Sequence, residues 1–202
     1  MKLKIAVLAV SNKRRHNDDY GRCVAGVTEN GEWIRLVADK DGDSLPVNTG
    51  LRPMSLIEAN VEYAPLVHQP ENAVLIDYRF AGGDIKNYLA ALKPCLERYV
   101  FGNPSNRLNE NEMREVRGSL RLILVRNLEI YSSGRWKVRF TYNECDYADI
   151  AMTDPKHYRN ERFDSAYILV SLPNAERCYG GYYKFAAAIY PVYHSPGTRR
   201  TN

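Results

Sequence analysis

Two passages, one in each half of the chain, share a pattern of apolar strand, polar loop and a further strand that carries aromatic and basic side chains. The first begins with the apolar run 1–10 and continues through a basic loop into 22–27 and 32–37. The second begins at 119–126 and continues through a Ser-Ser-Gly turn into 135–142. Short segments rich in Val and Ile between polar clusters are typical of strands. The pattern predicts two β-rich halves.

Hydrophobic periodicity adds further strands on both sides of a short helical middle. Between Asp84 and Tyr99 the apolar spacing becomes helical, with Asp84 as the expected N-cap. Asn109 is expected to cap a second short helix over 110–116. Strands outnumber helices, which predicts an all-β chain with a small helical middle segment. The expected strands are 3–10, 22–27, 32–37, 56–63 and 73–80 in the first half, and 119–126, 135–142, 145–152, 165–172 and 182–192 in the second.

The polar segment 102–107, Gly-Asn-Pro-Ser-Asn-Arg, is the expected hinge between the halves. We therefore expect a first unit over 1–102, a connector over 103–117 and a second unit over 118–192. The last residues, 193–202, are expected to form a flexible tail.

Charge and cysteine placement limit the classes of protein that this chain can belong to. The formal net charge of +4 is compatible with nucleic acid as a partner without requiring it. The four cysteines and four histidines are scattered, and no spacing among them matches a zinc site. The apolar stretch from Ile5 to Val10 is too short for a signal peptide or a membrane span. We expect a cytoplasmic protein with reduced thiols, no metal, no cofactor and no membrane contact.

Catalytic motifs are missing from the sequence. It contains no P-loop, nucleophile elbow, HExxH or paired-cysteine site. Cys23 with His16 or His68 could imitate a Cys–His pair, but Cys23 lies on a predicted apolar strand, where a thiol is usually inert. We therefore expect no catalytic residue, and binding rather than catalysis.

A series of short motifs runs in order through nearly the whole chain. It includes Gly21-Arg-Cys-Val-Ala-Gly26, Trp33-Ile-Arg-Leu-Val37, His68-Gln-Pro-Glu-Asn72, Ser119-Leu-Arg-Leu-Ile123 and Thr153-Asp-Pro155. As an ordered set, these motifs resemble the dual OB-containing domain family of bacteria. The resemblance implies two OB-like β-barrels in tandem that bind nucleic acid (DNA or RNA) or a nucleotide. It also implies a place beside prokaryotic defence systems, but it supplies no active site.

The implied fold agrees with the expected strands, which number five in each half. An OB barrel has five strands and binds oligonucleotides on its strand 2–3 face and the flanking loops. The expected function is a nucleic-acid-binding or nucleotide-binding sensor or adaptor of an anti-phage defence system, acting with a larger effector protein. The alternatives are a protein–protein interaction module without nucleic-acid contact and a nucleic-acid-processing enzyme.

We expect the main ligand surface on the first half. A basic loop lies between the first two strands, where an OB barrel closes over its ligand. Arg35 shares a strand face with Trp33, and an unpaired Arg is rarely buried, which favours an exposed face; Trp33 as a core residue is the alternative. The expected nucleic-acid-binding residues of this half are Lys13, Arg14, Arg15, His16, Arg22, Trp33 and Arg35.

The second half and a loop of the first add further predicted contacts. Trp136 and Phe140 should face the core, which leaves a basic stripe outside that either lines a groove or is simply solvated. Gln69 and Asn72 could read base edges, or could bond their loop to its own backbone. The expected stripe consists of Arg135, Lys137 and Arg139, together with Tyr142.

Overall fold

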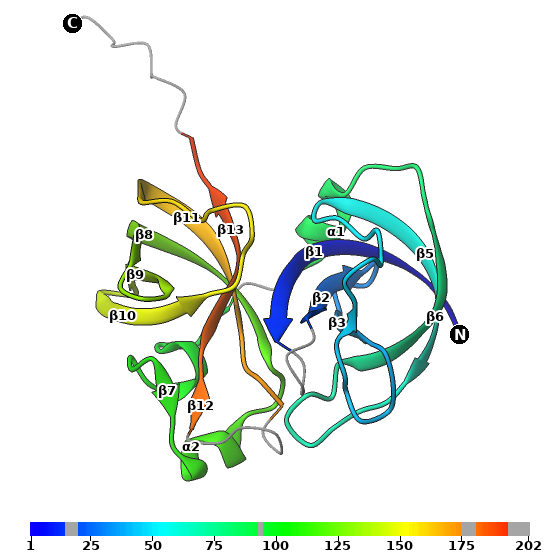
Figure 1. Ribbon diagram of the computed structural model, residues 1–202, viewed down its shortest axis with the longest axis horizontal. Helices are drawn as coiled ribbons and strands as arrows, with labels where there is room; N and C mark the ends of the chain where they lie inside the picture. The colour runs from blue at the N-terminus through cyan, green and yellow to red at the C-terminus, as the bar shows by residue number, and fades with distance from the viewer. Residues whose placement is uncertain (15–19, 93–94, 175–180, 194–202) are drawn as a thin grey trace, which may run out of the picture.

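The computed structural model describes residues 1–14, 20–92, 95–174 and 181–193, without the side chains of 12–14 and 20. Strands hold 54% of the described residues and helices 9%, which confirms a mostly β fold. Figure 1 shows two β-barrels side by side, the first built from the N-terminal half and the second from the C-terminal half.

The first barrel is a ring in which β1 pairs with both β2 and β5, while β3 pairs with β6. The β3–β6 pair is parallel and the other pairs in the ring are antiparallel. A short strand, β4, adds to the edge of β2. The strands are β1 (Lys2–Arg14), β2 (Tyr20–Thr28), β3 (Trp33–Val37), β4 (Leu45–Pro46), β5 (Ser55–Tyr63) and β6 (Asn72–Phe80).

The second barrel is closed in the order β10-β13-β11-β8-β9, and its parallel pair is β10–β13. Its first strand pairs with its second and fourth, and its third pairs in parallel with its fifth. The first barrel repeats this connectivity, so both rings have the five-stranded OB arrangement. The strands are β8 (Leu120–Ser132), β9 (Trp136–Tyr142), β10 (Cys145–Met152), β11 (Glu161–Ser171) and β13 (Phe185–Pro191).

The segment between the rings holds the short helices. Asn109 caps α2 through a capping box with Glu112, as the sequence predicts. Helix α1 is shorter than expected and begins one residue later, although the Asp84 carboxylate still accepts a hydrogen bond from the Lys86 amide at 2.8 Å. Whether the chain divides into units at 103–117 stays a prediction. The elements of this segment are α1 (Lys86–Ala91), the 3-10 turn η2 (Val100–Gly102), β7 (Arg107–Leu108) and α2 (Glu110–Glu115), and β7 pairs with β12 (Tyr182–Tyr183).

Each barrel is filled by the side chains that alternate inward along its strands. In the second barrel Phe140 stacks on Tyr147 with ring centroids 5.0 Å apart, and Trp136 packs against the same core. These positions confirm the expected inward face of β9. Tyr142 corrects the predicted basic stripe: it has the same strand parity as Phe140, so it is buried, and its hydroxyl donates to the backbone oxygens of Cys95 and Glu97.

Candidate nucleic-acid interface

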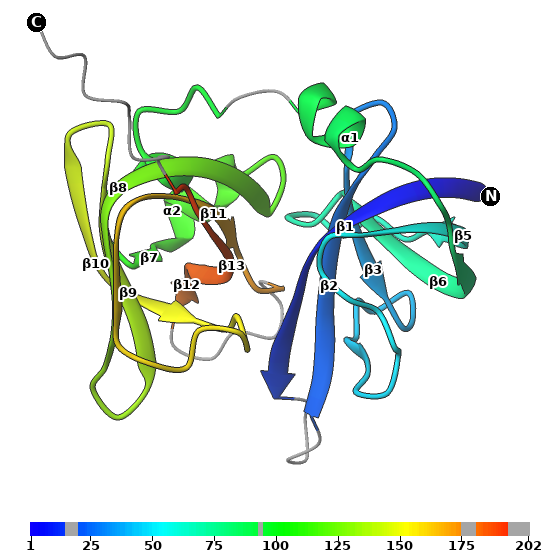
Figure 2. The same cartoon turned by 90° about the horizontal axis from the view of Figure 1, so that it is seen from above.

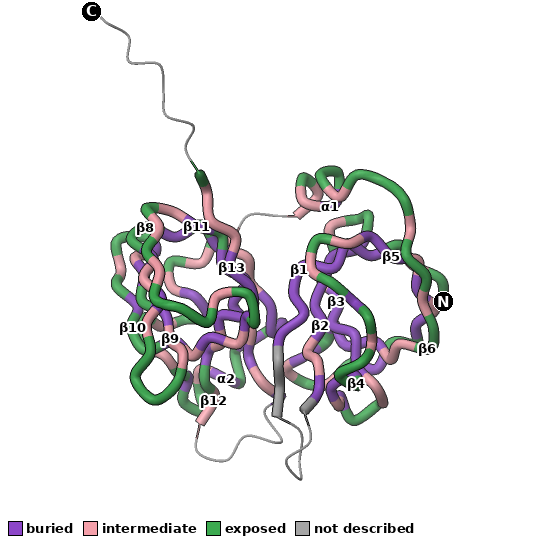
Figure 3. Tube along the Cα trace, turned by 45° about the horizontal axis from the view of Figure 1, so that its top comes forward, coloured by how far each residue is buried: buried purple, intermediate pink, exposed green. Residues whose placement is uncertain are grey.

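The second barrel covers the outer surface of β1, β2 and β3 in the first barrel. Ala9 and Ala25 pack here against Leu120 and Leu169, and Ala187 and Ala188 complete the contact. These small side chains let the strands approach closely, and Figures 1 and 2 show β13 beside β1. Figure 3 shows the facing stretches of β1 and β13 buried. The Tyr190 hydroxyl donates a hydrogen bond to the Leu8 carbonyl across this contact.

Trp33 lies between this contact and the helix α1. Its ring packs against the inter-barrel cluster and against a second cluster that contains Leu8, Val27 and Tyr88. The side chain is therefore half-buried outside the barrel core. Trp33 lies on the outward face of β3, because its neighbour Ile34 lies in the barrel core. It is neither in that core nor fully exposed, the two positions considered from the sequence.

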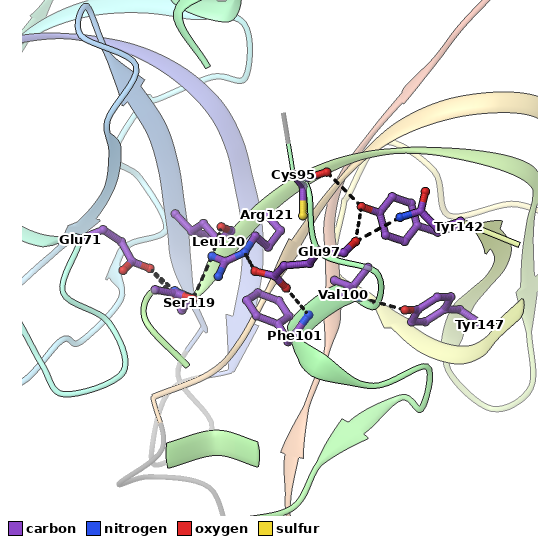
Figure 4. A network of polar contacts seen from close by, with 12 residues as sticks. Glu71, Cys95, Glu97, Val100, Phe101, Ser119, Leu120, Arg121, Tyr142 and Tyr147 are labelled. Carbon is purple, nitrogen blue, oxygen red and sulfur yellow. Dashed lines mark hydrogen bonds and ion pairs between the residues drawn. The ribbon is translucent and has the colours of Figure 1, made fainter. Parts of the chain in front are cut away.

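A buried polar cluster joins the two barrels beside these apolar contacts. The Arg35 guanidinium donates to the Ser119 hydroxyl at 2.6 Å and to the Leu172 carbonyl at 3.4 Å. Glu71 Oε1 accepts from the Ser119 amide at 2.9 Å and from the Ser119 hydroxyl. Figure 4 shows Glu71 turned toward Ser119 from the neighbouring barrel. Arg35 Nε lies 4.0 Å from Glu71 Oε1, so the cluster contains one charge of each sign.

Gln69 and Asn72 belong to the same buried region. Gln69 Nε2 donates to the Leu172 carbonyl at 3.2 Å, and Asn72 Nδ2 donates to Gln69 Oε1 at 3.2 Å. The exposed fractions of Arg35, Gln69 and Asn72 are 6%, 3% and 0%. In this arrangement none of the three faces solvent. Gln69 and Asn72 make hydrogen bonds within the protein, which agrees with the alternative to base reading. The bond from Gln69 to Leu172, however, joins the two barrels and does not lie within one loop.

The structure describes only part of the basic loop of the first barrel. Lys13 and Arg14 lie at the end of β1, opposite Gly21 and the first residue of β2, but their side chains are outside the described part. Arg15 and His16 also lie outside the described residues. Arg22 is half-buried on β2, and its Nε donates to the Val47 carbonyl at 3.5 Å. The binding role of this loop stays a prediction.

The second barrel leaves the outer surface of β8 and β9 exposed. Cross-strand register places Arg162, Glu129 and Arg139 in one row across β11, β8 and β9. A neighbouring row places Arg126 opposite Thr141. We call this surface the basic face and define it by Arg126, Arg135, Lys137, Arg139 and Arg162.

Carboxylates are interleaved with the cations of the basic face. Lys137 Nζ lies 2.7 Å from Asp149 Oδ1, and Arg139 Nη2 lies 2.6 Å from Glu129 Oε2. The hydrogen bond from Arg139 lowers the pKa of Glu129, and the hydrogen bond from Lys137 lowers the pKa of Asp149. Both carboxylates are therefore ionised at neutral pH. Exposed ion pairs contribute little to stability, so a phosphate can replace either carboxylate at small cost.

Aromatic rings accompany the basic face. The Arg139 guanidinium lies 5.7 Å from the centre of the Tyr131 ring on the adjacent strand. At the start of β9, Trp136 stacks on the exposed Tyr158, with ring centroids 6.2 Å apart and an interplanar angle of 24°. Cations together with aromatic rings are the elements with which proteins hold single-stranded nucleic acid.

The sequence did not indicate Arg126 and Arg162 of the basic face, nor Tyr158, which stacks on the inward-facing Trp136. Arg126, Tyr158 and Arg162 lie outside the predicted stripe, and only the strand register brings Arg126 and Arg162 beside β9. Tyr158 comes from the loop that follows β10. A predicted hairpin register over 119–142 would have placed Arg126 opposite Thr141 and so beside the stripe.

The family model of the dual OB-containing domain matches residues 3–189 of this chain. The chain belongs to the dual OB-containing domain family. This membership confirms the resemblance, and the paired OB-type rings agree with it. A comparison with curated proteins gave no match.

Within 1–14, 20–92, 95–174 and 181–193 no helix is long and apolar enough to cross a membrane. Those same ranges contain no group of three or more His, Cys, Asp or Glu side chains that could hold a metal ion. Cys23, Cys95 and Cys145 are half-buried free thiols.

Proposed function

We propose that this dual OB protein binds single-stranded nucleic acid on the basic face of its second barrel. One observation carries the proposal. In the first barrel the strand 2–3 surface, with which OB barrels bind oligonucleotides, is covered by the second barrel. In the second barrel the outer face of the equivalent second strand, β9, together with β8 and β11, carries exposed cations. The expected location on the first half therefore gives way to the second.

The chemistry of the basic face favours charge and stacking over base reading. Arg135, Arg139 and Arg162 are exposed arginines that match phosphate geometry, and Tyr158 offers a ring to a base. Such contacts tolerate any sequence, because every nucleotide has a phosphate and every base has an aromatic face. We therefore propose binding with little sequence preference.

Fluorescence anisotropy of the full chain with labelled single strands of DNA and RNA tests the proposal. The affinity should fall steeply as salt rises, because each phosphate contact releases condensed counterions. An affinity that is the same at low and physiological salt would contradict binding through the phosphates. No binding to either strand would favour the alternative of a protein–protein interaction module.

Replacing Tyr158 with alanine should weaken this binding about tenfold, since loss of one stacked base typically has this effect. Anisotropy titration of the variant at fixed salt measures the change. Tyr183→Ala is the matched control, because Tyr183 is similarly exposed but lies on β12 beside β7. Equal losses for both variants would argue against stacking at Tyr158.

We also propose a cellular role as a cytoplasmic sensor or adaptor without catalytic activity, which acts with a larger effector in prokaryotic defence. The family resemblance supports this role, as does a sequence without a catalytic motif. A pull-down from a native host should recover an effector such as a helicase or nuclease. Hydrolysis of nucleotides or DNA by the purified chain would contradict the non-catalytic part, and a partner recovered equally after nuclease treatment would favour direct protein contact.

A further inference from the structure

A cavity of about 330 Å³ opens between the two barrels, beside the buried polar cluster. We call it the inter-barrel cavity. It is lined by aromatic side chains from the first barrel and by arginines that precede or begin the second. This volume is at the small end of the range for small-molecule sites, which suits one heterocyclic ring. Its lining includes Trp33, Tyr63, Glu71, Arg117, Gly118 and Arg121.

Glu71 carries an unused acceptor in the wall of this cavity. Its side chain is 6% exposed, and its Oε1 already accepts both hydrogen bonds from Ser119. Its Oε2 is buried without a hydrogen-bond partner among the described residues. A buried carboxylate oxygen without a donor is unfavourable, because it has lost water and gained nothing in return. This oxygen can therefore accept a hydrogen bond from a donor that the described residues do not supply.

Gly118 leaves space next to this oxygen. A Cβ at Gly118 would lie 3.8 Å from Glu71 Oε2 and 3.6 Å from Arg121 Nη1, so the missing side chain keeps the gap between them open. The oxygen has almost no exposed surface, so a flat donor that enters beside Gly118 reaches it when the surrounding side chains move slightly apart. The backbone at Gly118 has a φ of 142°, a conformation that favours glycine.

The other walls of the cavity suit an aromatic ring that carries a phosphate. Trp33 is half-buried and Tyr63 is 44% exposed, so both have ring surface available for stacking. Arg117 is exposed, and its Nη1 donates to the carbonyls of Arg114 and Val116. Among the described residues, the remaining nitrogens of its guanidinium have no hydrogen bond or ion pair. They can bind a phosphate.

We propose that the inter-barrel cavity binds one nucleobase that carries an exocyclic amino group, as cytosine, adenine and guanine do. The amino group donates to Glu71 Oε2, the ring lies against Trp33 or Tyr63, and Arg117 binds the attached phosphate. Uracil and thymine place carbonyl oxygens where the amino group would be, and a carboxylate repels them. This site deepens the proposed function and rests on it. The base comes either from a free nucleotide or from an unpaired position of a bound strand.

Calorimetry with the full chain distinguishes the two sources of the base. If the source is a free nucleotide, CMP should bind saturably and UMP at least about tenfold more weakly. If the source is a strand, a uridine oligonucleotide with one internal cytidine should bind at least about tenfold more tightly than the all-uridine strand. Either result supports the site. Equal affinity within both pairs of ligands overturns it.

Two variants of exposed wall residues test the location without disturbing the fold. Tyr63→Ala and Arg117→Ala should each weaken the cytosine-dependent binding at least about fivefold, since they remove a stacking surface and a phosphate contact. The matched controls are Tyr167→Ala, with the same 44% exposure in the other barrel, and Arg114→Ala on the last turn of α2. The controls should leave this binding unchanged. Equal losses in variants and controls overturn the assignment.

Glu71→Gln tests the specificity itself. Glutamine retains the oxygen that accepts from Ser119 and turns an amide donor toward the cavity. The preference for cytosine over uracil should disappear or invert, whereas an unchanged preference overturns the role of Glu71. The basic face is a separate surface, so a parent protein that binds all-uridine strands in a salt-dependent way but shows no cytosine preference would refute the cavity site and leave the proposed function standing.

Discussion

Glu71→Ala is expected to lower the free energy of unfolding by about 3–5 kcal/mol, the usual effect of breaking a buried ion pair by removing one partner. The Arg35 guanidinium, which is 6% exposed, would remain between the barrels without its counter-charge. The Ser119 amide and hydroxyl would also lose their acceptor. Chemical denaturation followed by far-ultraviolet circular dichroism measures the change.

A double-mutant cycle separates this pairing from general damage to the interface. Arg35→Ala and Glu71→Ala together should cost clearly less than the sum of the two single variants, because neither leaves the other charge unpaired. Glu62→Ala removes an exposed partner of Lys40 and should leave the midpoint nearly unchanged. Additive single effects, or a Glu71→Ala variant as stable as the parent, would show that the cluster does not hold the barrels together.

Stability is expected to rise with pH between about 8 and 10 because of Lys184, which is 1% exposed. Burial lowers the pKa of its amine to about 8, and the nearby Glu97 and Glu112 offset this only in part. Its Nζ donates to Asn103 O at 2.6 Å and to Asn103 Oδ1 at 2.9 Å, which are two bonds that a neutral amine can make. The unfolded chain has an ordinary lysine, so it binds the proton more tightly than the folded chain.

Because the unfolded chain binds this proton more tightly, the free energy of unfolding increases with pH in this window. Stability is greatest above the unfolded pKa and is lost as pH falls through the folded pKa, over a total of about 3 kcal/mol. Burial raises the pKa values of Tyr142, Tyr147 and Tyr190, which reverses the trend only above pH 10. Denaturation at pH 7.5 and 9.5 measures the slope. Lys184→Met should remove the rise, and a parent protein whose stability is flat or falling in this window would contradict the assignment.

The strands and the two-barrel plan could be predicted from the sequence because they depend on local alternation. Ile34 faces the core and Trp33 faces outward, as period-2 spacing requires. The sequence could not predict that the second barrel buries this outward face, because the contacts are between distant residues. Arg35, for example, donates a hydrogen bond to Ser119, which is 84 residues away in the chain. The outward position of Arg35 on its strand therefore wrongly predicted an exposed side chain, which is in fact buried. The alanines at outward positions 9, 25, 187 and 188 were the available signal of close packing.

The candidate site was predicted in part for the same reason. Arg135, Lys137 and Arg139 follow one strand face, so alternation alone finds them. Tyr142 has the opposite parity, that of Phe140, so the same alternation places it in the core. The carboxylates that pair with the stripe, Glu129 and Asp149, come from neighbouring strands through registers that shift at β-bulges, which a single sequence does not reveal.

Nucleic acid is expected to bind the second barrel and not the first. The most direct test compares two triple variants of equal charge change by anisotropy over a salt series. One is Arg135→Ala, Lys137→Ala and Arg139→Ala on the basic face. The control is Lys40→Ala, Arg52→Ala and Arg79→Ala, which removes three exposed cations from the first barrel.

The basic-face variant should lose roughly thirty- to a hundredfold in affinity at physiological salt. Its salt slope should fall by about 2, since each phosphate contact contributes about 0.7 for a single strand. The control should bind as the parent protein does. Equal losses in both variants would show attraction by net charge alone, and a larger loss in the control would place the nucleic acid on the first barrel.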